Sequence, residues 1–66
     1  MENKYYNEIN KIVTEYENGK TFHTRNIDWA ADRVCWCWKW RKITREQMAE
    51  LADRISVIFD NNLFVD

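Results

Sequence analysis

The 66-residue chain has few of the residues that brace or break small folds. It contains no proline, one glycine, one histidine and two cysteines. Two cysteines in a C-x-C spacing and one histidine fall short of the four ligands of a structural zinc site, and they provide no framework of disulfides. A core of this size supplies only ~3–5 kcal/mol without such devices. The aromatic residues, 15% of the chain, or association with another chain must therefore stabilise it.

Long hydrophobic runs are also lacking, and we expect no secretory leader. The first ten residues, MENKYYNEIN, are polar, and no apolar stretch approaches the ~20 residues that span a bilayer. Two closely spaced cysteines without a secretory segment favour reduced thiols. We therefore expect one cytoplasmic domain over residues 1–66, with no membrane partner.

Residue sets that perform chemistry are scarce as well. Ser56 is the only serine, no Gly-rich phosphate loop is present, and His23 has no convincing nucleophile nearby. Cys35 and Cys37 would lie about 200° apart on a helix, so they can neither share a metal ion nor easily form a disulfide. We expect no enzyme activity, no metal site and no cofactor.

The hydrophobic pattern predicts three helices and no strand, which is typical of a small all-α three-helix bundle. The first helix is expected over residues 2–18, because apolar side chains recur there every three or four positions. Gly19 follows the last of them and suits a left-handed C-cap. Residues 20–26 are expected to form a loop from which Phe22 folds back onto the core.

The third helix, expected over residues 44–60, has the clearest start signal. Thr44 and Gln47 have the T-x-x-Q spacing of a capping box, and Ile43 and Met48 stand at the positions of a hydrophobic staple. Glu50 and Arg54 form a favourable i,i+4 pair, and the sequence DNN is expected to end the helix before a short apolar tail, LFVD. The expected core face comprises Met48, Leu51, Ala52, Ile55, Ile58 and Phe59.

The middle helix, expected over residues 27–41 with Asn26 or Asp28 as its N-cap, carries two apolar faces. At about 100° per residue these faces point in nearly opposite directions. The expected core face comprises Ile27, Ala30, Ala31, Val34, Cys37 and Trp38. The opposite side, which we call the tryptophan face, comprises Trp29, Arg33, Trp36 and Trp40.

Two neighbouring helices cannot cover both faces of the middle helix, so the tryptophan face is expected to stay available at the surface. Trp and Arg are the residue types enriched in binding hot spots. Lys39, Arg41 and Lys42 would form its basic rim. The alternative is that the N-terminal helix, the Phe22 loop or the LFVD tail covers these indoles within the chain.

These features predict a non-catalytic protein-binding module, whose partner is a second copy in a homodimer or a larger host complex. Residues 20–42 contain six basic residues and two aspartates, so nucleic-acid binding through this segment is an alternative, as is a purely structural oligomer. The net charge of −1 and the acids of the third helix disfavour nucleic acid. The small size, the lack of a catalytic residue set and the dense binding-type surface suit small accessory proteins of phages and mobile elements, such as anti-CRISPR inhibitors. No sequence motif supports this assignment.

Overall fold

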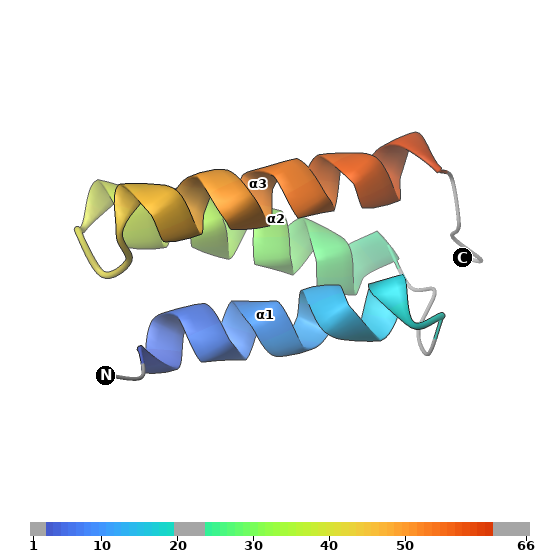
Figure 1. Cartoon of the computed structure of the whole chain (residues 1–66), viewed down its shortest axis with the longest axis horizontal. Helices are drawn as coiled ribbons and strands as arrows, with labels where there is room; N and C mark the ends of the chain where they lie inside the picture. The colour runs from blue at the N-terminus through green and yellow to red at the C-terminus, as the bar shows by residue number, and fades with distance from the viewer. Residues whose placement is uncertain (1–2, 20–23, 62–66) are drawn as a thin grey trace.

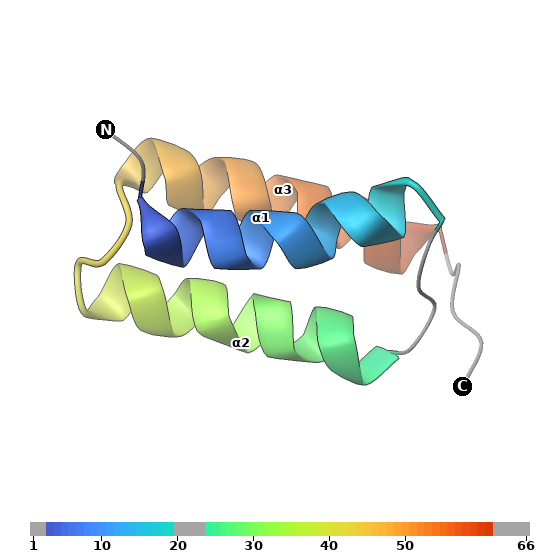
Figure 2. The same ribbon diagram turned by 90° about the horizontal axis from the view of Figure 1, so that it is seen from below.

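The computed structural model describes residues 3–19 and 24–61, which form three helices (Figure 1). They are α1 (Lys4–Glu17), α2 (Thr24–Lys39) and α3 (Arg45–Asp60). Each helix packs against both others, and successive helices run in opposite directions (Figure 2). The predicted all-α three-helix bundle is confirmed, with overall dimensions of 33 × 19 × 16 Å. In the part of the chain that is described, no helix is long and apolar enough to cross a membrane.

Helix α1 is capped at both ends by its own flanking residues. The Asn3 side chain accepts hydrogen bonds from the backbone N–H groups of Tyr5 and Tyr6, at 2.9 and 3.2 Å, which satisfies two of the unpaired donors of a helix start. Gly19 has a φ of 70° and its N–H donates to the carbonyl of Tyr16 at 3.1 Å. The expected left-handed glycine is confirmed, because only a residue without Cβ adopts this backbone at no steric cost.

Helix α2 differs from its prediction at both ends. It begins at Thr24, so Asn26 and Asp28 lie inside the helix and the prediction that one of them caps it is wrong. Asn26 instead faces α1 across a groove that it lines together with Trp29. Helix α2 ends at Lys39, two residues earlier than predicted. The following residues leave the helical conformation and form a turn with different hydrogen bonds.

That turn is a Schellman motif with an arginine in the left-handed position. The N–H of Lys42 donates to the carbonyl of Cys37 at 2.7 Å, and the N–H of Arg41 donates to the carbonyl of Trp38 at 3.1 Å. These are the two bonds that define the motif. Arg41 has a φ of 59°, a conformation that glycine normally supplies at this position. The turn also receives the Asn3 side chain, whose Nδ2 donates to the Lys42 carbonyl at 2.8 Å.

The start of helix α3 confirms the predicted capping box. The Thr44 hydroxyl accepts from the N–H of Gln47 at 3.1 Å, and the Gln47 side chain accepts from the N–H of Thr44 at 3.0 Å. The helix ends at Asp60 with Asn61 as its C-cap, as the DNN sequence predicts. The tail LFVD and the loop residues Phe22 and His23 lie outside the described residues.

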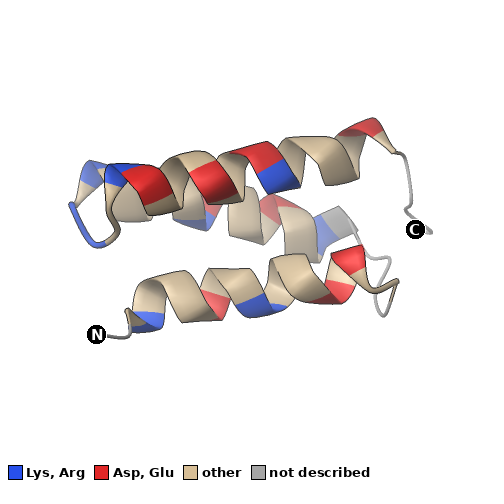
Figure 3. Ribbon diagram, viewed as in Figure 1, with Lys and Arg blue, Asp and Glu red and all other residues tan. Residues whose placement is uncertain are grey.

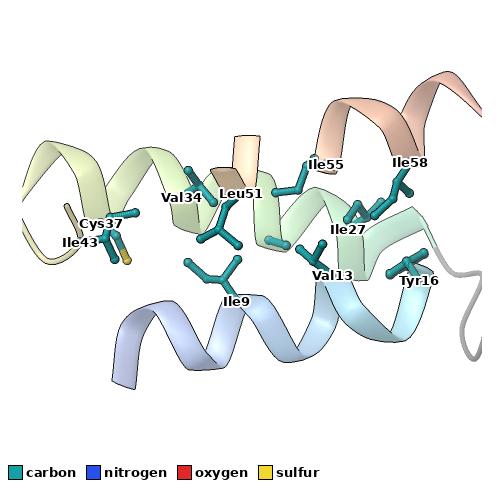
Figure 4. Close-up of a cluster of buried hydrophobic side chains, with 11 residues drawn as sticks. Ile9, Val13, Tyr16, Ile27, Val34, Cys37, Ile43, Leu51, Ile55 and Ile58 are labelled. Carbon is teal, nitrogen blue, oxygen red and sulfur yellow. The ribbon is translucent and has the colours of Figure 1, made fainter. Parts of the chain in front are cut away.

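The core is a single apolar cluster between the three helices (Figure 4). Helix α3 buries a narrower stripe than predicted. Ala52 is exposed and Phe59 is 37% exposed, because they lie about 100° and 80° around the helix from Leu51, at the edge of the contact. On α2, Ala31 and Trp38 are half-buried at the rim of their predicted core face. The buried residues are Ile9, Val13, Tyr16, Ile27, Ala30, Val34, Cys37, Ile43, Leu51, Ile55 and Ile58.

Polar side chains close the contact between α1 and α3. The predicted i,i+4 pair between Arg54 and Glu50 is present at 3.4 Å, but the stronger partner of Arg54 is Glu17 of α1. Two guanidinium nitrogens, Nε and Nη2, donate to the two carboxylate oxygens of Glu17 at 2.9 and 2.6 Å. Arg54 also donates to Asn10 at 2.7 Å and to Thr14 at 3.3 Å. These hydrogen bonds join α1 to α3, so the polar side chains on this side of the bundle stabilise the fold.

Candidate functional site

The tryptophan face lies beside the seam between α1 and α2, which faces the viewer in Figure 2. Its indoles are partly open to solvent: Trp29 is 41% exposed, Trp36 40% and Trp40 57%. Trp36 joins Trp40 and Tyr5 of α1 into one cluster, since its ring centroid is 6.4 Å from that of Trp40 and 6.3 Å from that of Tyr5. Trp29 lies farther along the seam, beside a groove. Helix α1 therefore borders the indoles without covering them.

Cations lie over the rings of this surface. The Arg33 guanidinium carbon is 4.4 Å from the Trp36 ring centroid and 5.9 Å from that of Tyr5. The Lys39 ammonium is 5.8 Å from the Trp40 ring. Such contacts attract a cation to the ring face electrostatically.

Two members of this cluster, Lys4 and Tyr5, come from α1, and their part in it was not predicted from the sequence. Tyr5, which the helical pattern places in the core stripe of α1, is only half-buried. It has the Lys4 and Lys42 ammonium groups at 5.5 and 5.8 Å from its ring. The only signal in the sequence was the K-Y pair at the helix start, which does not reveal a contact made across two helices.

The predicted basic rim divides between two sides of α2. Lys39 and Lys42 adjoin the tryptophan face, whereas the Arg41 guanidinium lies 4.7 Å from the ring of Trp38, on the side of α2 that faces α3. All three rim residues are exposed. Together with Lys4 and Arg33 they form a set that we call the basic end, where α1 begins and α2 ends (Figure 3). The basic end comprises Lys4, Arg33, Lys39, Arg41 and Lys42.

Among the described residues, no carboxylate forms an ion pair with the basic end. Among residues 3–19 and 25–61, the only ion pairs within 4 Å join Arg54 to Glu17 and to Glu50, at the other side of the bundle. The cations of the basic end are held by aromatic rings instead. Their charge is therefore not neutralised by an ion pair within the described part of the chain.

A shallow groove occupies the opposite half of the same seam. It has a volume of about 360 Å³ and lies between Trp29 on α2 and the facing side of α1. Its character is acidic and apolar, with two glutamates around an isoleucine and one lysine. The lining residues are Glu8, Lys11, Ile12, Glu15, Asn26 and Trp29.

The two cysteines have different environments. Cys37 is fully buried in the core, and burial raises the pKa of its thiol, so that it behaves as a small apolar side chain. Cys35 is exposed, and both are free thiols. In the described part of the chain, no three His, Cys, Asp or Glu side chains converge in a way that could hold a metal ion.

Comparison with known proteins gives no match for this chain among family models, curated proteins or solved structures. The site must therefore be interpreted from its own chemistry.

Proposed function

We propose that this chain is a non-catalytic protein-binding module whose docking surface is the tryptophan face together with the adjoining basic end. One observation carries the proposal: half-exposed indoles are surrounded by cations that have no carboxylate partner among the described residues. Tryptophan and arginine dominate binding hot spots because they bury large areas with few rotatable bonds. The unpaired cations would steer an acidic partner towards those rings.

The chemistry of the partner follows from this surface. It should present apolar side chains that cover the indoles and carboxylates that meet the lysines and arginines of the basic end. Two kinds of protein fit this description: a second copy of this chain, and an acidic subunit of a larger host complex. The second would suit an inhibitor carried by a phage or a mobile element. In the same proposal the module works in the cytoplasm, where free thiols such as those of Cys35 and Cys37 persist.

Nucleic acid is the second candidate, because rings interleaved with cations also bind single strands. The structure offers less for this function. Arg33 lies over the Trp36 ring and Lys39 over the Trp40 ring, where a base would otherwise stack. The exposed side of α3 carries Glu46 and Asp53, and these carboxylates would repel phosphates that extend beyond the basic end.

A pair of probes separates the two candidates. The first is a synthetic helical peptide with leucines along one face and glutamates along the other, and the second is an oligothymidylate of matched charge. Titration is followed by tryptophan emission. We expect the peptide to bind more tightly than the oligothymidylate. Trp36→Ala should raise the dissociation constant of the peptide by about tenfold to thirtyfold, as loss of a hot spot does.

The control variant is Val57→Ala, which truncates a 52% exposed side chain on α3 away from the seam. It should leave peptide affinity unchanged, and circular dichroism should show that both variants keep their helices. A peptide in which alanine replaces the leucines should bind poorly. Tighter binding of the oligothymidylate, with an affinity that falls steeply as salt rises, would overturn the proposal in favour of nucleic acid.

A further inference from the structure

We propose that the occupant of the tryptophan face is a second copy of this chain, in a two-fold dimer in which each α2 runs antiparallel to the other. This inference rests on the proposed function and names the partner of the same surface. It is carried by the distribution of charge along the seam between α1 and α2.

The seam has opposite charge at its two ends. Lys4, Arg33, Lys39 and Lys42 cluster around Tyr5, Trp36 and Trp40 at one end. The other end, around Trp29, carries carboxylates of which none is in an ion pair within the described residues. Lys11 and Arg25 also lie there and reduce this negative charge without cancelling it. Glu8 and Glu15 line the groove at this acidic end, and Asp28 and Asp32 are exposed on α2 within one helical turn of Trp29.

An antiparallel arrangement matches these ends to each other. A two-fold axis that crosses α2 between Asp32 and Arg33 relates position 29 to position 36, since each lies 3.5 residues, or about 5 Å, from the axis. Trp29 of one copy then faces Trp36 of the other, because both lie on the centre line of the face. Asp28 comes within two residues, or about 3 Å along the helix, of Lys39 of the other copy, a gap that a lysine side chain spans.

Other ways of pairing the same surface are less favourable. A parallel dimer would place basic end against basic end, and like charges in contact disfavour association. A head-to-tail contact between the basic end of one copy and α3 of the next would leave an unused surface at each end, which leads to open chains and not to a closed dimer. Only the antiparallel pair satisfies both ends at once.

The area that a dimer needs is a modest share of the surface of this chain. A stable interface needs about 800 Å² from each protomer, which is about a sixth of the 4830 Å² surface of this chain. The flank that contains the seam is as long as the 33 Å molecule. A dimer would also add buried apolar area to a fold whose own core is small.

A charge-swap experiment tests this arrangement. One variant, Glu15→Lys with Asp28→Lys, makes the acidic end basic. The other, Lys4→Glu with Lys39→Glu, makes the basic end acidic. None of these four side chains is buried in the core, so both variants should fold, which circular dichroism checks. Molar mass is measured by sedimentation equilibrium.

We expect the wild-type chain to be a dimer and each variant alone to dissociate, with a dimer dissociation constant raised at least tenfold. An equimolar mixture of the two variants should form a heterodimer, because each reversed end then meets its complement. Regained association in the mixture cannot arise from unfolding, so this result supports the proposal directly. Val57→Ala should dimerise as the wild type does, and Trp36→Ala should not.

Two results would overturn the dimer. A monomeric wild-type chain that still binds the acidic peptide through Trp36 would remove the second copy as partner and leave the proposed function standing. A dimer that survives Trp36→Ala and both charge reversals would show that a different face associates; the peptide titration then decides the proposed function by itself.

Discussion

At the scale of single residues, Arg54 makes the most extensive set of side-chain hydrogen bonds between α1 and α3 among the described residues. Its guanidinium contacts Glu17, Asn10 and Thr14 on α1 as well as Glu50 on its own helix. Glu50 in turn accepts a hydrogen bond from the Tyr6 hydroxyl. Hydrogen bonds between charged groups contribute more than neutral ones, and the Arg54 side chain is only 24% exposed, which limits screening by water.

We expect Arg54→Ala to lower the free energy of unfolding by about 1–3 kcal/mol, measured by urea denaturation. The loss leaves Asn10 and Glu17 without their donor. The matched control is Arg45→Ala on the same helix, where the arginine is exposed and in no ion pair of the described residues; it should change stability by less than about 0.5 kcal/mol. Equal losses in the two variants would contradict the role given to Arg54.

Glu17 makes the stability of the bundle depend on acid. The hydrogen bond from Arg54 holds the pKa of the Glu17 carboxyl below its usual range, helped by the positive charge and opposed by burial. The folded state therefore favours the carboxylate. The stability it contributes is present above the unfolded pKa of about 4.5 and is lost as pH falls through the lower folded pKa. Urea denaturation at a series of pH values should show this fall, and Glu17→Gln should flatten it.

At the scale of elements, the ends of the helices are set by local hydrogen bonding. The Thr44–Gln47 box and the Gly19 cap are readable in the sequence because they need specific residue types at fixed spacings. The end of α2 is different. Arg41 occupies the left-handed position of the Schellman turn, which costs a residue with a Cβ about 1–2 kcal/mol, and its stacking on Trp38 offsets part of that cost.

We expect Arg41→Gly to raise the free energy of unfolding by up to about 1 kcal/mol, because relief of the left-handed strain exceeds both the lost stacking and the added flexibility of the unfolded chain. Arg41→Ala serves as the control, since it removes the cation and keeps the Cβ. It should be less stable than Arg41→Gly in thermal denaturation. If the alanine variant proves equal to the glycine variant, backbone strain at this position is absent.

At the scale of the whole molecule, two helix contacts that include α1 serve different purposes. The α1–α3 contact is closed by the Arg54 network, whereas the α1–α2 contact leaves its aromatic surface half open. The core between the helices is a cluster of eleven side chains. A core this small tolerates little loss.

We expect Leu51→Ala to leave the chain largely unfolded at room temperature. Leu51 is fully buried, and truncating such a side chain lowers the free energy of unfolding by about 2–5 kcal/mol. The core of a domain of this size supplies only ~3–5 kcal/mol in total. The helical circular dichroism signal should fall accordingly. Val57→Ala on the same helix should keep the wild-type signal, and a folded Leu51→Ala chain would show that the core has more reserve than its size implies.

Much of the architecture could be predicted from the sequence, because it depends on local rules. Three amphipathic stretches, a glycine after the first and a capping box before the third determined the number of helices and the well-marked ends. The prediction failed where local rules compete. Asn26 and Asp28 are good capping residues, yet α2 already begins at Thr24. Ala52 and Phe59 match the helical period, but the stripe that two neighbours cover is narrower than the stripe that the pattern suggests.

The sequence by itself determined that three indoles and an arginine share one side of α2, since the angle between residues on a helix does not depend on what surrounds it. Only the tertiary structure decided what stands next to them. The packing of α1 against α2 brings Tyr5 to Trp36 and Lys42, and the left-handed turn at Arg41 places its guanidinium over Trp38. Contacts between helices arise from packing of the whole core, which no spacing within one helix records.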